Sequence, residues 1–513
     1  MDQTMKQDQV PQLKPIKSSQ ANGDEQTNQV GTKGFAYACE LSKRELQMVC
    51  TELFILYEIV WPVVVTGILL YSRNQVSMLF LGRLGTAQLA GGSIANAFAN
   101  ITGYSVLKGL SAGMEPICGQ AYGARQWPIL SQTVQKTILL LLVAAIPISL
   151  LWIYMEPILL FFYQKPEILT PAKEYILFSL PDLFAQAFLH PVRIFLRTQN
   201  ITRPVSVCAT VGLVLHVPIS YFLVFYMGLG VKGVALASSL NTININLGLI
   251  GYMIFSKSCL KPWTGSLVPG LKGWVQLIRL AIPSCIGVCL EWWWYEVMMV
   301  VCGWLVDPKA SVASFGILIQ MTSLIYVFPS SLGLGLSTRV AHELGAGRPT
   351  QARLASAVGI VVSMICGIVS CLFAVSVKDV WGTMFNNDSS ILHLTAVALP
   401  IIGMCEIGNS PQTVGCGVLR GSAKPAIGAH INFAAFYLVG LPVSLLCAFP
   451  FKMGFVGLLM GLLAAQASCA CFMLYAINNI DWEAQAEKAR NFSESSRENS
   501  DLEASLIVSE CKV

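Results

Sequence analysis

The sequence predicts an all-α integral membrane protein with twelve transmembrane helices arranged as two pseudo-symmetric six-helix bundles. Three observations support this prediction. Hydrophobic residues make up 54% of the 513 residues and charged residues only 12%, about half the share typical of soluble domains. Runs of about 20 apolar residues recur along the chain. These runs form two sets of six that resemble each other.

Gly, Pro and charged clusters interrupt the apolar runs and so delimit the expected helices. The first set lies at 53–79, 87–112, 131–154, 172–196, 204–227 and 231–255. The second set lies at 274–305, 311–338, 355–377, 391–419, 426–449 and 454–477. The expected domains are a polar N-terminal tail (1-50), an N-lobe (51-256), an inter-lobe loop (257-273), a C-lobe (274-478) and an acidic, Ser-rich C-terminal tail (479-513).

Basic residues in the loops predict the orientation of the chain. About thirteen Lys and Arg fall at the even-numbered loops and about seven at the odd-numbered loops, and the excess marks the cytoplasmic side. We therefore expect both tails and the inter-lobe loop in the cytoplasm. No removable signal peptide is visible in the N-terminal tail, so the first transmembrane helix is expected to act as the targeting signal. We expect a multi-pass protein of the plasma membrane, with the vacuolar and the endosomal or Golgi membranes as alternatives.

An internal repeat relates the two halves at an offset of about 220 residues. The matched landmarks are Pro62 with Pro283, Gln120–Arg125 with Glu343–Arg348, Leu180-Pro181 with Leu399-Pro400, Leu196-Arg197 with Leu419-Arg420, and Gly230 with Gly454. Because each half has six helices, both run in the same direction, and a pseudo-two-fold axis lies along the membrane normal. Halves related in this way enclose a central cavity in many secondary transporters.

Three carboxylates within the apolar runs are candidates for proton coupling. Glu291 and Glu296 lie in the seventh expected helix and Glu406 lies in the tenth. A carboxylate is costly in hydrocarbon unless it faces a cavity, finds a partner or takes up a proton. Glu291 and Glu296 point about 140° apart, so only one is expected to face the cavity squarely. Glu406 shares a face with Asn409, and its alternative role is that of a structural, hydrogen-bonded acid.

Polar stripes on two helices of the first half are candidates for substrate binding. In the second expected helix the stripe recurs every fourth residue, as it does in the fourth helix. The residues are Asn96, Asn100, Tyr104 and Lys108 in the second helix, and Asp182, Gln186 and His190 in the fourth. Lys108 can either pair with Asp182 or offer a positive site to an anionic substrate. With Asn409, these residues are expected to line the cavity.

An aromatic run surrounds the two acids of the seventh helix. Trp293 and Trp294, within Trp292–Tyr295, are candidates for substrate contact through stacking and cation–π interaction. At most one or two of four successive helical residues can face the cavity, and the alternative is packing against lipid or neighbouring helices. Walker A and HExxH motifs are absent from the sequence, so we expect a transporter rather than an enzyme, driven by a proton gradient without cofactor or metal.

Three segments resemble a known family. The segment Phe80–Ala124 (FLGRLGTAQLAGGSIANAFANITGYSVLKGLSAGMEPICGQAYGA) resembles the signature of MATE (multidrug and toxic compound extrusion) transporters, as does CLEWWWYE around Leu290. The segment Asn409–Pro425 (NSPQTVGCGVLRGSAKP) is similar to the tenth-helix signature of the plant DETOXIFICATION branch. The likeness extends over nearly all of 50–480 and excludes the tails.

The resemblance implies a MATE-like pair of six-helix bundles and efflux of organic solutes in exchange for protons. The solute of plant members is often a xenobiotic cation, a secondary metabolite, a hormone or an organic acid. The family's coupling acid of the seventh helix falls on Glu291, and the second acid of that helix falls on Glu296. The tenth-helix acid, usually aspartate, falls on Asn409, so Glu406 one turn earlier is the candidate replacement. Lys108 also departs from the small or apolar residues common at its position.

Two other classes of function remain as alternatives to a proton/solute antiporter. Arg73, Lys108 and the basic central loops favour an anion channel-like transporter. The tail sequence SESSRENSD favours a membrane regulatory scaffold that binds a kinase or another protein. The expected partners are otherwise a small organic solute and the lipid bilayer, with no nucleic acid, and the expected assembly is a monomer.

Overall fold

The computed structural model describes residues 26–161, 166–256, 273–385 and 388–491. The chain divides into two compact units, residues 1–51 and 52–513. The described part of the first unit is helical and continues into helix α1 (Gln26–Leu84). Residues 1–25 of the N-terminal tail, residues 257–272 of the inter-lobe loop and the C-terminal segment SESSRENSD lie outside the described residues. The structure therefore does not test the roles expected for them.

Helices form the first half of the second unit. After the part of α1 that begins at Glu52, the second expected helix is built from three consecutive pieces, which α4 extends, and the fourth from two. The elements are α2 (Thr86–Ala99), η1 (Asn100–Tyr104), α3 (Ser105–Ala112), α4 (Met114–Gly123), α5 (Trp127–Ile153), α6 (Met155–Phe161), α7 (Pro166–Phe178), α8 (Leu180–Thr198), α9 (Arg203–Tyr221), η2 (Phe222–Tyr226) and α10 (Val231–Phe255).

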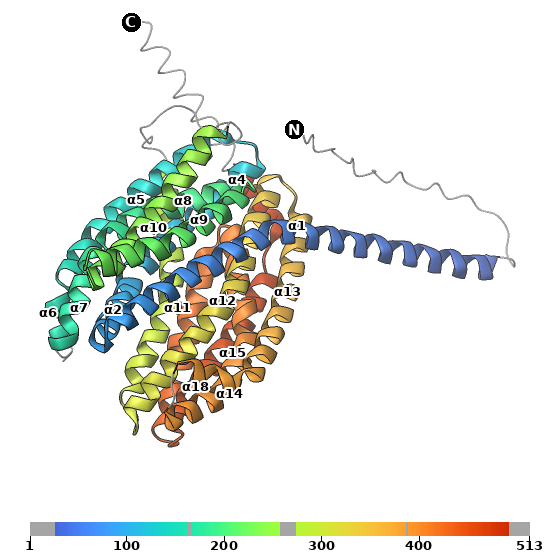
Figure 1. Ribbon diagram of the computed structural model, residues 1–513. Helices are drawn as coiled ribbons and strands as arrows, with labels where there is room; N and C mark the ends of the chain where they lie inside the picture. The colour runs from blue at the N-terminus through green and yellow to red at the C-terminus, as the bar shows by residue number, and fades with distance from the viewer. Residues whose placement is uncertain (1–25, 162–165, 257–272, 386–387, 492–513) are drawn as a thin grey trace, which may run out of the picture. The chain divides into compact units, whose positions relative to one another are not determined.

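The second half repeats this pattern of helices. The elements are α11 (Trp274–Cys302), α12 (Pro308–Gly345), α13 (Pro349–Ser376), α14 (Lys378–Trp381), η3 (Gly382–Met384), α15 (Ser389–Gly421), α16 (Pro425–Asn432), η4 (Phe433–Gly440), α17 (Leu441–Ala448) and α18 (Gly454–Asn478). Figure 1 shows α12, α13, α15 and α18 gathered in one bundle and α5, α8, α9 and α10 in another. The described residues thus fold as an all-α protein without strands.

Ten helices among the described residues are long and apolar enough to cross a membrane. The two expected spans that do not meet this measure are 87–112 and 172–196. The first contains Asn96, Asn100 and Lys108, which lower its mean hydropathy. The second contains α8, which carries Asp182, Arg193 and Arg197. Both segments contribute polar residues to the cavity described below, which explains why they can be less apolar.

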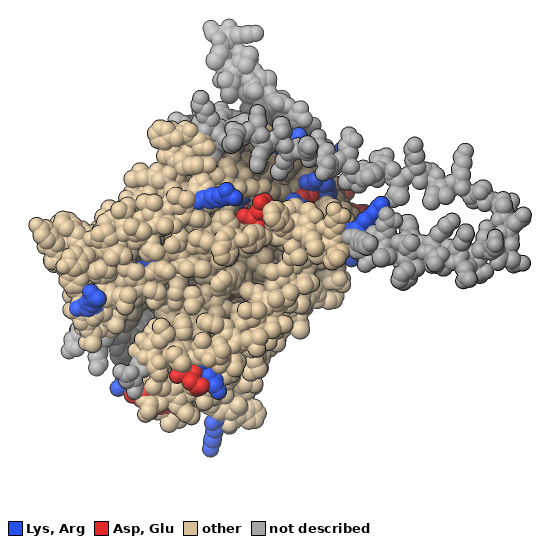
Figure 2. Space-filling view, turned by 45° about the vertical axis from the view of Figure 1, so that its right-hand side comes forward, with Lys and Arg blue, Asp and Glu red and all other residues tan. Residues whose placement is uncertain are grey.

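Each half contains its own apolar core. In the first half, Trp152 is fully buried among α2, α5, α7 and α8. In the second half, Trp294 is fully buried with Phe436 and Leu459. Large apolar side chains also remain exposed on the outer helices, such as Val143 on α5 and Leu372 on α13. Figure 2 shows a face with few charged side chains, as expected for a surface in contact with lipid.

The loops between helices confirm the internal repeat at the level of the backbone. The helices α4 and α12 end at Ala124 and Ala346, which have identical dihedral angles (φ −79°, ψ 0°). The next residues, Arg125 and Gly347, both have positive φ (59° and 69°), the conformation that commonly ends a helix. Arg125 therefore corresponds to Gly347. The sequence motifs, in contrast, pair Arg125 with Arg348, one residue away from the pairing that the helix ends define.

The two halves meet through very close helix contacts. Helix α3 packs against α11, and α4 packs against α12. A methyl group added at Gly109 would lie 2.6 Å from the Cα atom of Cys285, so only glycine permits this approach. The carbonyl oxygen of His342 blocks the same addition at Gly123, and the carbonyl oxygen of Gln120 blocks it at Gly345. These last two contacts are reciprocal, as expected around a two-fold axis.

Candidate functional site: a central pocket between the two halves

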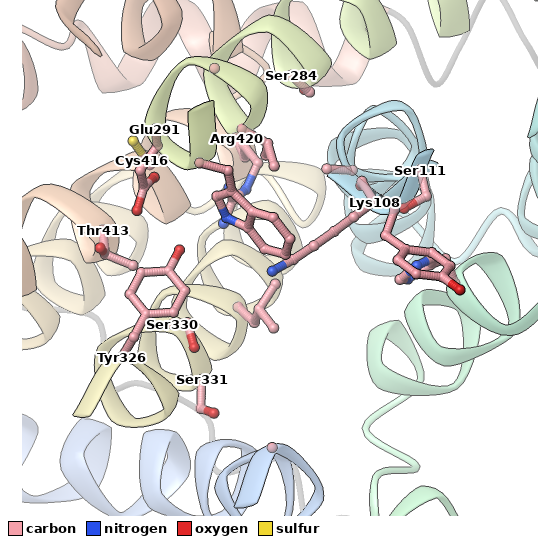
Figure 3. Close-up of a pocket in the computed structure, with 18 of the residues that line it drawn as sticks. Lys108, Ser111, Ser284, Glu291, Tyr326, Ser330, Ser331, Thr413, Cys416 and Arg420 are labelled. Atoms are coloured by element: carbon pink, nitrogen blue, oxygen red, sulfur yellow. Dashed lines mark hydrogen bonds between the residues drawn. The ribbon is translucent and has the colours of Figure 1, made fainter. Parts of the chain in front are cut away.

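A pocket of about 410 Å³ lies between the two halves, within the usual range for small-molecule sites. We call it the central pocket. It is lined by residues of α1, the second-helix pieces, α8, α11, α12, α15 and α16. Figure 3 shows Lys108 reaching into it from one side, while Glu291, Tyr326 and Thr413 face it from the other. Both halves therefore contribute polar groups to one cavity.

The expected stripe of the second helix lies on the pocket wall. Asn96, Asn100, Tyr104 and Lys108 all line the central pocket. Residues spaced by four drift by about 40° per step around an α-helix. The π-helical turn Asn100–Tyr104 is wider than an α-helical turn and offsets part of this drift. The turn thus helps keep the four side chains on one face, a contribution that the sequence pattern does not reveal.

The stripe of the fourth helix is only partly exposed to the pocket. Gln186 and His190 line the pocket, whereas Asp182 does not. Asp182 is 3% exposed, and its Oδ2 accepts a 2.7 Å hydrogen bond from the Tyr104 hydroxyl. Asp182 therefore lies behind the pocket wall and holds Tyr104 in place, rather than contacting a solute directly.

Lys108 does not form the expected ion pair with Asp182. Its Nζ lies 4.6 Å from the centre of the Trp292 ring, and no described carboxylate is within salt-bridge distance of it. The Asp182 carboxylate instead accepts the hydrogen bond from the Tyr104 hydroxyl. The geometry therefore excludes the pairing of Lys108 with Asp182. It is compatible with the other role considered for Lys108, that of a positively charged group facing the pocket.

Glu291 is the carboxylate that reaches the central pocket from α11. It is 9% exposed, and its carboxylate lies near the side chains of Tyr326, which also lines the pocket, and of the buried Gln412. Glu296, on the same helix, does not line the pocket. The expectation that only one of the two acids faces the cavity agrees with this placement.

Glu406 and Asn409 are buried behind the pocket, not on its wall. Asn409 Nδ2 donates a 2.8 Å hydrogen bond to Glu406 Oε2, and the two residues are 2% and 1% exposed respectively. A chain of polar groups leads from them toward the pocket. Thr413 Oγ1 lies 3.5 Å from Asn409 Oδ1 and 3.2 Å from Gln412 Oε1. Glu291 and Glu406 are thus joined through polar side chains of α15.

The three consecutive tryptophans of α11 have three different environments. Trp292 lines the central pocket. Trp293 is 40% exposed, and its Nε1 donates a 3.0 Å hydrogen bond to the carbonyl oxygen of Ile101. Trp294 is fully buried against Phe436. The expectation that Trp293 and Trp294 face the cavity is therefore wrong, and Trp292 faces it instead. Successive residues of an α-helix point about 100° apart, and packing decides which of the three rings points inward.

The wall of the pocket contains an ion cluster that sequence reasoning missed. We call it the Glu115 cluster. Glu115 accepts hydrogen bonds from Arg197 (2.7 Å) and from Ser337 (2.9 Å), and Arg420 Nε lies 3.4 Å from it. Arg197 also donates to Thr338 (3.2 Å). These contacts join α4 and α8 of the first half to α12 and α15 of the second.

A signal for this cluster was present in the repeat. Arg197 and Arg420 are the matched arginines of the two halves, and both approach Glu115. Counting back equally from Ala124 and Ala346 reaches Glu115 and Ser337, which are thus equivalent positions in contact with each other. Arg197, Arg420 and Arg193, which the sequence analysis counted only among the basic residues of the loops, therefore line the pocket. The sequence could have identified them as a matched pair within polar, membrane-embedded segments.

Comparisons with known proteins agree with this architecture. The MatE family profile matches residues 62–222 and 283–446. Protein DETOXIFICATION 48 of Arabidopsis thaliana is 53% identical over 432 residues, which are 84% of this chain and 81% of that protein. Protein DETOXIFICATION 51 of the same plant is 50% identical over 459 residues, 90% of this chain and 86% of that protein.

Solved structures show the same arrangement of helices. The crystal structure of the eukaryotic MATE transporter AtDTX14 superposes with a TM-score of 0.83 at 32% identity, covering 87% of this chain and 100% of that one. The Vibrio cholerae MATE transporter VcmN, at 16% identity and a TM-score of 0.74 over 85% of this chain and 99% of that one, has the same fold. The chain therefore belongs to the MATE family of multi-pass membrane transporters and has its twelve-helix fold.

Proposed function

We propose that this chain is a proton-coupled antiporter, which expels a small organic solute in exchange for protons entering through the same pocket. MATE transporters act in multidrug and detoxification efflux, and the names of the Arabidopsis relatives refer to detoxification. The observation that carries the proposal is Glu291, a buried carboxylate on the wall of a cavity shared by both halves.

Protonation of Glu291 changes how the carboxyl group interacts with the second half. The charged carboxylate can only accept hydrogen bonds from neighbours such as Tyr326 and Gln412, whereas the protonated acid can also donate one. Removing the charge also removes the cost of keeping it in an apolar interior. Helix α11 packs against both α3 and α16. A change at Glu291 can therefore alter contacts on both sides of the pocket.

The buried pair of Glu406 and Asn409 extends this coupling. Its hydrogen bond is part of the polar chain that leads through Thr413 to Gln412, and Gln412 is also bonded to Asn432 of α16 (3.2 Å). We propose that Glu406 acts as the second coupling acid, in place of an acid at position 409. A proton at Glu406 would change contacts among α15, α16 and α18 without touching the solute.

Transport by purified protein in liposomes tests this proposal. Vesicles loaded with a panel of organic solutes should lose them faster when the outside is made acidic, and Glu291→Gln should abolish this acceleration. Glu483→Gln, which removes an exposed carboxylate outside the pocket, is the matched control and should transport normally. Efflux that ignores both the pH gradient and Glu291→Gln would show that protons are not exchanged.

A channel-like anion transporter remains the second candidate because of the basic residues of the pocket. Recording from planar bilayers distinguishes the two, because a channel gives large currents that saturate weakly. We also propose that the protein acts as a monomer in the plasma membrane. Gel filtration with light scattering and imaging of a tagged chain test these two points.

A further inference from the structure

We infer that the central pocket binds solutes that carry a negative charge, held by Lys108 and Arg193. This assignment rests on the proposed function, because it names the class of solute that is exchanged for protons. The charges on the pocket wall are unequal. Among the residues that the structure describes, five cationic side chains line it and two carboxylates do, Glu115 and Glu291. The cations are Arg73, Lys108, Arg193, Arg197 and Arg420.

The carboxylates are not placed to neutralise all of these cations. Glu115 is shared by Arg197 and Arg420 in the Glu115 cluster, so two arginines face one carboxylate there. Glu291, the other carboxylate, is not within salt-bridge distance of any of these cations. The pocket therefore keeps an excess of positive charge whether or not Glu291 holds a proton.

Three of the pocket cations, Arg73, Lys108 and Arg193, lack a carboxylate partner, and of these Lys108 and Arg193 also have no hydrogen-bonded side chain that the structure describes. Among the described residues, no acid lies within salt-bridge distance of either. Arg73, by contrast, donates hydrogen bonds to Thr242 (3.1 Å) and Asn74 (3.2 Å). An unpaired cation inside a membrane protein is costly. A solute carboxylate, sulfonate or phosphate would supply the missing partner, and a cationic solute would be repelled.

The remaining lining suits a flat organic anion. The Trp292 ring beside Lys108 Nζ and the Tyr326 ring on the opposite wall (Figure 3) provide apolar faces for stacking. Cation–π contact with Trp292 is weaker than pairing with an anion. Lys108 can therefore turn from the ring to the solute without a large cost. The cavity of about 410 Å³ accommodates a small aromatic acid.

Charge on the solute has a consequence for the transport cycle. Exchange of one entering proton for one leaving anion moves two positive charges inward, whereas exchange for a monovalent cation moves none. Anion efflux is then driven by a negative interior as well as by the pH gradient. A proton on Glu291 adds positive charge near the bound anion, so repulsion between proton and solute cannot expel it. Release must come from rearrangement of the two halves.

Two probes of similar size and permanent charge test the assignment in the full-length protein. Naphthalene-2-sulfonate is the anion and N-methylquinolinium is the cation. We expect the purified protein to bind the sulfonate in preference to the quinolinium. Lys108→Gln and Arg193→Gln should each weaken sulfonate binding on the order of tenfold, the loss expected for a charged hydrogen bond. Lys108→Arg keeps the charge and should retain most of the affinity.

Matched controls separate a local effect from a general loss of charge or of folding. Lys378→Gln and Arg353→Gln remove exposed cations outside the pocket and should leave sulfonate binding unchanged. The melting temperature of each variant is measured in parallel. If Lys108→Gln melts like the parent protein and still binds the sulfonate equally well, the assignment is overturned.

Flux measurements keep this assignment and the proposed function apart. In liposomes, a potassium diffusion potential that makes the interior negative should accelerate sulfonate efflux beyond the leak of protein-free vesicles. Exchange of protons for the quinolinium, with no flux of the sulfonate, overturns the anion assignment and leaves the proposed function intact. Potential-driven sulfonate flux that ignores the pH gradient supports the anion assignment and contradicts proton exchange.

Discussion

Ser337 Oγ donates a 2.9 Å hydrogen bond to Glu115 Oε2, and these two residues occupy equivalent positions in the two halves. The bond therefore lies where the pseudo-two-fold relation brings the halves together. Glu115 is also the carboxylate that Arg197 and Arg420 share. The cluster lies on the wall of the central pocket and links the two halves. Separation of the halves at this point would break these contacts, so they should influence both stability and the conformational equilibrium.

The first prediction concerns the stability provided by the Glu115 cluster. Glu115→Ala leaves the buried Arg197 without its carboxylate, which should destabilise the fold by about 3–5 kcal/mol. Glu156→Ala, which breaks the exposed pair with Lys173, should cost about 0–1 kcal/mol. Melting curves in detergent compare the two. Similar melting temperatures for both variants would show that the cluster does not hold the halves together.

The second prediction concerns the close contact of α3 with α11. Gly109→Ala places a methyl group 2.6 Å from the Cα atom of Cys285 and should cost about 1–3 kcal/mol through overpacking. Gly251→Ala, where nothing lies within 4 Å of the added group, should be neutral or slightly stabilising. Thermal stability and transport rate are measured for both. An unaltered Gly109→Ala protein would mean that the halves separate there without penalty.

The third prediction ranks the three intramembrane acids. Glu291→Gln should abolish gradient-driven efflux because Glu291 lines the pocket. Glu406→Gln should also reduce it strongly, since it changes the hydrogen bond with Asn409. Glu296→Gln should retain transport, because Glu296 does not line the pocket. Liposome efflux at several external pH values distinguishes them, and loss of coupling only in Glu296→Gln would reverse the ranking.

The fourth prediction concerns the hydrogen bond that positions Tyr104. Tyr104→Phe removes the donor to the buried Asp182 carboxylate and should destabilise the protein by about 1–3 kcal/mol. The same substitution in an Asp182→Asn background should cost less, because the charged acceptor is already absent. A double-mutant cycle on unfolding measures the difference. Equal costs in both backgrounds would show that the two side chains do not interact.

Much of the architecture could be predicted from local pattern. The apolar runs located the transmembrane segments, and the repeated landmarks paired Arg197 with Arg420 across the halves. The spacing of Asn96 and Lys108 placed them on one face of a helix, and the structure places both on the pocket wall. These predictions succeeded because hydrophobicity and helical period depend on residues that are close in the sequence.

The sequence by itself therefore determined the membrane fold, the internal repeat and the likeness to MATE transporters. Only the tertiary structure decided that Trp292 rather than Trp294 faces the pocket, that Tyr104 rather than Lys108 binds Asp182, and that Glu115 is shared by two arginines. The physical reason is the same in each case. Periodicity shows which side chains share a helix face, but the rotation of each helix is set by packing against helices far away in the chain.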